Sequence, residues 1–270
     1  MLFHDHLVIL RGGGDLATGV AYRLHKAGFP LIVLELERPF VIRRRVALAT
    51  AVLENEVHIG DLHGKLAATP EDAFELAYTN TIPVLVAPTI PPFILHHSSS
   101  QVVIDGRIAK RNIDTSLEQA PLVIGMGPGF TAGVDCHAII ETMRGHTLGR
   151  VIWDGSALPN TGTPGIIAGK GAERVVRAPV EGMVDWRLEI GDLVQSGDVL
   201  GNVAGEPVTA PFDGVVRGLI APGTAVKQGF KIGDVDARGN VQACFTISDK
   251  ALAIGGAALE AILTHLNNHS

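Results

Sequence analysis

The sequence predicts an α/β fold: a Rossmann-like domain with a parallel sheet, then a small all-β domain, then a C-terminal helix. Two observations predict the first domain. Short apolar runs alternate with helix-like segments, and twice such a run leads through a glycine-rich turn, at Gly12–Gly14 and at Gly125–Gly129. An internal repeat in the second half predicts the all-β domain. The expected domains are residues 1–172, 173–247 and 248–270.

The first elements follow from hydrophobic periodicity and helix end signals. Each apolar run that is bounded by turn residues is expected to be a buried strand, and a strand, a glycine turn and a helix in succession indicate a βαβ unit with parallel strands. The expected strands and helices are, in order, a strand at 7–10, a helix at 16–26, a strand at 31–36, and helices at 39–53 and 69–78.

The later elements are predicted by the same signals. Residues 84–87 and 122–124 are expected to be strands, and Asp105-Gly106 favours a hairpin over 102–110 because this dipeptide suits a tight turn. The second glycine turn predicts a helix over 134–143. Ser248 is expected to cap a final helix that ends near Asn267 and buries one apolar face, including Leu252, Leu259 and Leu263.

The repeat relates Ala178-Pro179-x-x-Gly182-x-Val184 to Ala210-Pro211-x-x-Gly214-x-Val216 at a constant offset of 32 residues. Two copies of a short β unit indicate a pseudo-twofold β-sandwich. The pattern resembles the barrel-sandwich hybrid of biotinyl and lipoyl carrier domains, in which a lysine between the halves bears the cofactor. No lysine occurs from Ala178 to Val226, so we expect neither biotin nor lipoate, and a role in packing or docking.

Composition limits the classes of function. The net charge of −6, with Arg43-Arg44-Arg45 as the basic cluster, argues against nucleic acid as the main partner. On the expected helix this triplet would form a solvated face or hold an anion, and Arg43 and Arg44 are candidates for cofactor binding. The apolar run Leu7–Leu10 is too short to be a secretory signal or a membrane span, so a cytoplasmic location without a membrane partner is expected. Two distant cysteines exclude a CxxC metal motif. The histidines of the middle region, His58 and His63 among them, lack metal-motif spacing, and the metal is left unknown.

The first glycine turn, Gly12-Gly13-Gly14-Asp15-Leu16-Ala17, fits the dinucleotide fingerprint G-x-G-x-x-G/A between a strand and a helix. Its glycines and the helix N-terminus are suited to binding phosphate, and Glu35 at the end of the second strand is placed to bind a ribose hydroxyl. Asp15 puts a negative charge beside the phosphate, so close helix–strand packing is the alternative explanation of these glycines.

The second turn contributes Gly125, Gly127, Gly129 and Thr131 as further cofactor-binding candidates, and a set of catalytic candidates follows it: Asp135, Cys136, His137 and Glu141. On a helix, His137 and Glu141 would share a face and could bind a metal, relay a proton or form a surface ion pair. Asp135 fits a helix cap or a catalytic acid. Cys136 fits a nucleophile with a lowered pKa or a small buried residue.

Four segments together resemble the YqeB family of accessory proteins of the selenium-dependent molybdenum hydroxylase system. They are Val8–Gly19, Ile42-Arg43-Arg44, Gly127–Asp135 and Ile232–Asp236. The resemblance covers nearly the whole chain, and Arg43, Arg44, Asp135, His137 and Glu141 match the family pattern.

The resemblance implies a maturation factor for xanthine dehydrogenase-like molybdenum hydroxylases, with a nucleotide or a molybdopterin-type cofactor held at the glycine turns. The implied partners are the hydroxylase or other maturation proteins, and a homo-oligomer is possible. An NAD-dependent oxidoreductase and a non-catalytic scaffold are the alternatives. Whether the chain is an enzyme stays open.

Overall fold

The computed structural model describes residues 1–96, 100–162, 165 and 169–269. It divides into two compact units, and the chain passes between them more than once. The first unit contains residues 1–39, 47–160 and 247–270. The second contains residues 40–46 and 161–246. A short piece of the N-terminal half therefore belongs to the same unit as the internal repeat.

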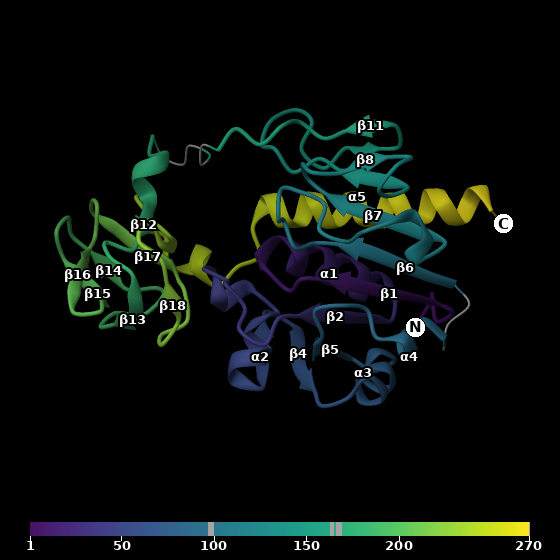
Figure 1. The fold of residues 1–270 in the computed structure, drawn as a ribbon, viewed down its shortest axis with the longest axis horizontal. Helices are drawn as coiled ribbons and strands as arrows, with labels where there is room; N and C mark the ends of the chain where they lie inside the picture. Colours follow the sequence, from purple (N-terminus) through teal and green to yellow (C-terminus); the bar gives the residue numbers. More distant parts are fainter. Residues whose placement is uncertain (97–99, 163–164, 166–168, 270) are drawn as a thin grey trace. The chain divides into compact units, whose positions relative to one another are not determined.

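The first unit is built on a nine-stranded sheet with the order β10-β9-β7-β6-β1-β2-β5-β4-β3 (Figure 1). The seven inner strands, from β9 through the central β1 to β4, pair in parallel. Strands β3 and β10, at the two edges, run antiparallel to their neighbours. The strands span His6–Arg11 (β1), Leu31–Glu35 (β2), Glu56–Ile59 (β3), Leu62–Ala67 (β4), Thr81–Val86 (β5), Ser100–Asp105 (β6), Leu122–Met126 (β7), Ala138–Ile140 (β9) and Val151–Ile152 (β10). Two short strands, Thr131–Ala132 (β8) and Gly155–Ser156 (β11), form a separate ribbon.

Helices cover both faces of the sheet. Leu7 and Ile9 of β1 share a core with the helices α3 (Pro70–Ala77) and α4 (Pro92–His96). Because side chains alternate along a strand, the neighbouring residues of β1 face the opposite side. There α1 (Asp15–Ala27) and α5 (Asp249–Asn268) lie alongside each other (Figure 1). The short α2 (Thr50–Glu54) precedes β3.

The second unit contains two four-stranded sheets, with the orders β12-β19-β17-β14 and β16-β15-β13-β18. Its strands are Val175–Arg177 (β12), Gly182–Trp186 (β13), Leu193–Val194 (β14), Val199–Val203 (β15), Glu206–Thr209 (β16), Gly214–Leu219 (β17), Ala225–Val226 (β18) and Lys231–Asp236 (β19). The two copies of the repeat exchange hydrogen bonds: the Gly197 N–H donates to the Ala210 carbonyl at 2.9 Å, and the Gly229 N–H donates to the Ala178 carbonyl at 2.8 Å.

The predicted fold class is wrong. The Rossmann-like parallel sheet is instead a mixed sheet, because hairpin β3–β4 and the pair β9–β10 add antiparallel strands at its edges. The structure also gives no support for a biotinyl/lipoyl-like barrel-sandwich hybrid: β12–β19 form two separate sheets, and Phe40–Val46 joins their unit. A repeat within one stretch of sequence cannot reveal a contribution from a distant segment.

Several predicted elements are confirmed. The strands at 7–10 and 31–36, the helix at 16–26 and the C-terminal helix match β1, β2, α1 and α5. Thr69 caps α3 by accepting from the Asp72 N–H at 3.1 Å, and Ser248 caps α5 by accepting from the Ala251 N–H at 3.2 Å. These elements are specified by local signals, which explains why sequence alone identifies them.

Three other predicted elements are wrong. Residues 39–53 form a 3₁₀ turn and the short α2 instead of one helix. Residues 107–110 form no strand, since Ile108 and Lys110 have φ angles of 54° and 62°, and β6 pairs with β1 and β7. The segment 134–143 contains strand β9, whose Ala-Ile-Ile run extends the sheet beside β7. In each case pairing with distant residues overrides the local pattern.

Candidate ligand site at the carboxyl ends of strands β1 and β6

The order of the strands reverses between β1 and β6. The chain passes from β1 to β2 on one side and returns to place β6 on the other side of β1. In open sheets, ligands bind at the carboxyl ends of parallel strands where the order reverses in this way. Arg11 ends β1 and Asp105 ends β6, and they are register partners. This edge of the first unit is the candidate ligand site.

The first glycine turn lies at this edge, and its first two N–H groups are already bound within the protein. Gly12, with φ 94°, donates to the Leu34 carbonyl at 2.7 Å, and Gly13 donates to Glu35 Oε2 at 2.8 Å. The other oxygen of Glu35 accepts from the Leu36 N–H at 2.7 Å. Both carboxylate oxygens of Glu35 therefore accept hydrogen bonds from backbone N–H groups. Glu35, expected to bind a ribose hydroxyl, instead fixes the conformation of the turn.

Gly13 packs tightly, whereas Gly14 faces open space. A Cβ at Gly13 would lie 2.8 Å from the Ala49 backbone nitrogen, so this glycine permits close packing. A Cβ at Gly14 would meet nothing within 4 Å. Gly14 is also the N-cap of α1, and no side chain caps this end of the helix. The N-terminus of α1 thus retains the open space and the partial positive charge that favour an anion.

Lys250 supplies a cation near this helix end. It belongs to the first turn of α5, and α5 contacts α1 so closely that a Cβ at Gly19 would lie 2.2 Å from the Ala251 carbonyl oxygen. Burial and the charge of Arg144 lower the pKa of Lys250, while the charge of Asp15 raises it. Lys250 therefore lies within the electrostatic reach of Asp15 and offsets the negative charge beside the predicted phosphate position.

A network of buried charges fixes the loop that follows β6. Arg107 binds Asp105 through two hydrogen bonds of 3.0 and 2.6 Å, and the Thr115 hydroxyl donates to Asp105 at 2.6 Å. Arg11, almost fully buried, pairs with Asp114 at 2.8 Å, and its hydrogen bond holds the pKa of that carboxyl below the ordinary value. The network joins the ends of β1 and β6 to the loop that contains Asp114 and Thr115.

The second glycine turn is explained by packing. A Cβ at Gly125 would lie 2.7 Å from the ring of Phe130, and a Cβ at Gly127 would lie 2.5 Å from the Thr142 hydroxyl. At Gly129, which has φ 109°, a Cβ would lie 2.4 Å from the Arg111 backbone nitrogen. The turn therefore supports the loop after β6.

Asp135 stabilises the second glycine turn through hydrogen bonds. Its carboxylate accepts from the Thr131 N–H at 2.7 Å and from Asn112 Nδ2 at 2.8 Å. The Thr131 hydroxyl lies 3.1 Å from the Ser156 hydroxyl. Because no helix begins here, Asp135 closes a loop instead of capping a helix.

Cys136 is fully buried, and burial raises the pKa of its thiol to about 11. The expected helix N-terminus, which would lower that pKa, is absent from residues 134–143, all of which the structure describes. The thiol is therefore protonated at neutral pH.

His137 and Glu141 do not share a helix face, because they flank strand β9. His137 Nδ1 accepts from the Val123 N–H at 3.0 Å, and burial lowers the pKa of the imidazole. The buried carboxylate of Glu141 accepts from the N–H groups of Met143 at 2.7 Å and Leu158 at 2.8 Å. Both residues bind backbone of their own unit.

Arg43 and Arg44 belong to the second unit and are buried there. Arg43 donates to the Ala243 and Thr246 carbonyls at 3.0 and 3.3 Å, and Arg44 Nε donates to the Leu219 carbonyl at 2.8 Å. These contacts attach residues 40–46 to the second unit, so the two arginines are not on a solvated helix face.

Sequence reasoning missed the charged residues of the site, namely Arg11, Asp105, Arg107, Asp114 and Lys250. One signal was available: Arg11 and Asp105 each follow an apolar strand directly and precede a glycine. Lys250 and Asp114 gave no signal, since only the tertiary fold brings them to this edge.

One group within the described residues has the donors and spacing for a metal ion. The ligand atoms of Glu56, His58 and His63 on hairpin β3–β4 lie within 4.8 Å of one another. His58 and His63 are cross-strand partners, and Glu56 Oε2 lies 3.1 Å from His63 Nε2. Four residues separate the two histidines in the sequence, and the hairpin brings their side chains together.

No helix among the described residues has the length and apolarity needed to cross a membrane. No family model matches the chain. Solved structures that resemble it include an ectoine utilization protein, EutE (DoeB), from Ruegeria pomeroyi, with 14% identity, 87% of this chain and 58% of that chain covered, and a TM-score of 0.23. An aspartoacylase family protein from Mesorhizobium loti has 12% identity over 86% of this chain and 85% of that chain, with a TM-score of 0.28.

A curated protein gives a much stronger match. The chain is 47% identical over 257 residues to "Uncharacterized protein YqeB" of Escherichia coli strain K12, a match that covers 95% of this chain and 47% of that protein. The chain thus spans about half the length of this relative, and over that length it is similar to YqeB.

Proposed function

We propose that the first unit binds a phosphate-bearing cofactor, a nucleotide or a molybdopterin-type compound, at the start of α1. The observation that carries this proposal is the uncapped N-terminus of α1, where Gly14 faces open space at the carboxyl end of β1. A helix N-terminus with an unobstructed glycine can approach a phosphate closely. Lys250 adds positive charge within reach of the same turn.

We further propose that this binding serves the maturation of selenium-dependent molybdenum hydroxylases, with the hydroxylase or another maturation protein as the partner. This part rests on the resemblance to the YqeB family. Among the described residues, the catalytic candidates after β7 bind backbone groups or are buried, which favours a binding role over turnover.

The arrangement of Glu35 favours this proposal over an NAD-dependent oxidoreductase. A dinucleotide-binding acidic residue needs a carboxylate oxygen for the ribose hydroxyls. Both oxygens of Glu35 accept from backbone N–H groups instead. A ribose hydroxyl of NAD would have to share a carboxylate oxygen with a backbone N–H group.

Thermal unfolding with NAD, ATP, CTP or a molybdenum cofactor tests the ligand. A compound at about 100 times its Kd should stabilise the protein by about 2.7 kcal/mol. Gly14→Val should fold, since its side chain enters open space, but should block the phosphate and abolish the stabilisation. Gly256→Ala is the matched control because a Cβ there also meets nothing within 4 Å. Stabilisation that survives in Gly14→Val would place the ligand elsewhere.

The maturation role is tested on a molybdenum hydroxylase purified from cells with and without this gene. We expect the selenium content and the activity to fall when the gene is deleted, with molybdenum retained if the protein acts at selenium insertion. An unchanged enzyme would refute the role. Complementation with Gly14→Val then asks whether ligand binding and maturation are linked.

A further inference from the structure

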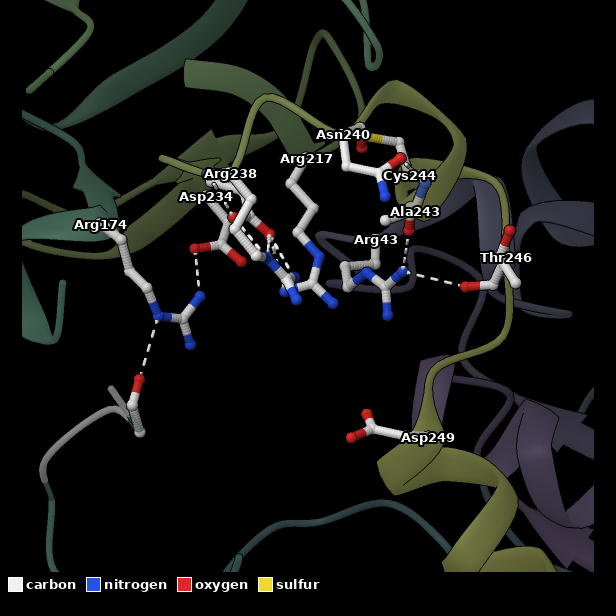
Figure 2. A network of polar contacts seen from close by, with 12 residues as sticks. Arg43, Arg174, Arg217, Asp234, Arg238, Asn240, Ala243, Cys244, Thr246 and Asp249 are labelled. Carbon is white, nitrogen blue, oxygen red and sulfur yellow. Dashed lines mark hydrogen bonds and ion pairs between the residues drawn. The ribbon is translucent and has the colours of Figure 1, made fainter. Parts of the chain in front are cut away.

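The second unit contains a cluster of arginines and aspartates that the proposed function does not use. Figure 2 shows Arg43, Arg174, Arg217 and Arg238 near Asp234, with their guanidinium groups turned toward the same side. The cluster consists of Arg43, Arg174, Arg217, Asp234, Asp236 and Arg238.

The two aspartates are already engaged by two of the arginines. Arg174 Nη1 binds Asp234 at 2.5 Å, and Arg238 binds Asp236 through Nη2 at 2.6 Å and Nε at 3.0 Å. Both aspartates are about 4% exposed. Each carboxylate is therefore largely neutralised by an arginine other than Arg217.

Arg217 is the residue whose hydrogen bonding is incomplete. Its side chain is 8% exposed, and its Nη1 approaches Asp236 only to 3.5 Å. Its buried Nε has no hydrogen-bond partner among the residues that the structure describes. Burial, together with the charge of Arg43, lowers the pKa of this guanidinium. A buried cation with an unsatisfied donor is costly, and such groups commonly mark a bound ion or water.

An oxyanion would satisfy these groups. The planar guanidinium presents parallel N–H donors that match the oxygens of a phosphate, and a second nearby guanidinium strengthens the charge-assisted hydrogen bonds. Arg43 and Arg238 lie within the electrostatic reach of Arg217. The cluster thus combines the planar guanidinium of Arg217 with the positive charges of Arg43 and Arg238.

We propose that this cluster is a second, separate site in the protein and that it binds a tetrahedral oxyanion of the phosphate type, with Arg217 as the central ligand. The oxyanion is either a free ion or the terminal phosphate of a larger molecule, since the chemistry of recognition is the same. All the residues that carry the site belong to the second unit, so it is independent of the proposed function of the first.

Calorimetric titration of the full chain at constant ionic strength tests the site, with inorganic phosphate as one probe and AMP as the other. Arg217→Met keeps an unbranched apolar side chain like the arginine stem and removes the charged guanidinium. Because a hydrogen bond to a charged group contributes about 1.5–3 kcal/mol, phosphate affinity should fall at least about tenfold. Arg187→Gln, which changes an exposed arginine of the same unit, should leave the affinity unchanged.

The two probes separate the sources. Tighter binding of AMP that Arg217→Met abolishes identifies a phosphate monoester, whereas binding of phosphate alone identifies the free ion. The phosphate binding that Arg217→Met removes should persist in Gly14→Val, so a failure of the proposed function can be distinguished from a failure of this second site. If Arg217→Met does not fold, Arg238→Gln replaces it, because that side chain is 46% exposed. The proposal is overturned if the wild type binds neither probe, or if Arg187→Gln weakens binding as much as the variant in the cluster.

Discussion

At the scale of single residues, the catalytic candidates named from the sequence stabilise loops. Asp135 and Glu141 each use both carboxylate oxygens to accept hydrogen bonds from loop groups. Polar residues in a motif-like run can thus have a structural role, because buried backbone N–H groups need hydrogen-bond acceptors. The residues with ligand-binding potential, Gly14 and Lys250, are distinguished instead by open space and by charge.

The cysteines provide a residue-scale prediction. With the pKa of Cys136 at about 11 instead of 9, the thiolate fraction at neutral pH is lower by about two orders of magnitude. Cys244 is also buried, and burial raises its pKa. We expect a chromogenic disulfide reagent at pH 7.5 to modify neither thiol in the native protein and both in urea.

The same groups give a pH dependence. A thiol whose folded pKa is raised contributes stability below its unfolded pKa, and this contribution is lost as the pH rises from about 9 toward 11. The Tm of the wild type should therefore fall more steeply over this range than that of Cys136→Ala. Rapid modification of Cys136 in the native protein at pH 7.5 would contradict both expectations.

At the scale of elements, α5 buries small residues together with Ile262, and the predicted Leu263 is 41% exposed. The small residues Ala251, Gly255 and Ala258 are buried. The backbone of α1 approaches this face so closely that a Cβ at Gly255 would lie 2.2 Å from the Gly19 carbonyl oxygen. Leucines would hold the two helices apart, so the small residues determine the packed face.

Two glycine variants test this packing. Gly19→Ala should destabilise the protein by about 1–3 kcal/mol, since its methyl group would overlap the Ala251 carbonyl and force the helices apart. In Gly256→Ala on α5, the added methyl group meets nothing within 4 Å, and the variant should stabilise the protein by about 0.5–1 kcal/mol. Urea unfolding measures both changes. Equal effects of the two variants would show that helix propensity, rather than contact, decides stability here.

Hairpin β3–β4 gives a second prediction at this scale. Three nitrogen and oxygen donors suit Zn²⁺, and Glu56, His58 and His63 offer them from adjacent strands. We expect one Zn²⁺ per hairpin in a calorimetric titration, lost on chelation with EDTA. His63→Ala should abolish this binding, whereas His4→Ala at an exposed position elsewhere should not. Unchanged stoichiometry in His63→Ala would assign the ion to other ligands.

At the scale of the whole molecule, the second unit takes residues 40–46 from the first half of the chain. A Cβ at Gly218 of β17 would lie 2.8 Å from the carbonyl oxygen of Ile42, so this glycine admits the segment. The hydrogen bond from Arg44 to the Leu219 carbonyl holds it in place. The unit is therefore discontinuous in sequence, and its integrity depends on contacts between distant segments.

Trypsin tests this arrangement, because Arg43, Arg44 and Arg45 are potential cleavage sites in the segment. Arg43 and Arg44 are buried, so the native protein should resist cleavage there. Gly218→Ala should displace Ile42 and weaken the attachment of the segment by about 1 kcal/mol. Cleavage should therefore be several-fold faster, because about 1.4 kcal/mol corresponds to a factor of ten. The control variant Gly256→Ala should be cleaved at the wild-type rate. Equal cleavage rates in the wild type and both variants would mean that the contact between Gly218 and Ile42 does not hold the segment.

The sequence by itself determined the elements that local chemistry specifies, such as β1 with its glycine turn, the Thr69 cap of α3 and the Ser248 cap of α5. It also determined the relation to YqeB, because that is carried by residue identities. Only the tertiary structure decided the mixed sheet, the hairpin at its edge, the strand at 138–140 and the discontinuous second unit. The physical reason is that these features depend on which distant segments meet. Strand direction, close helix contact and the ion pairs Arg11–Asp114 and Arg238–Asp236 all join such segments. Periodicity within one segment does not encode these contacts.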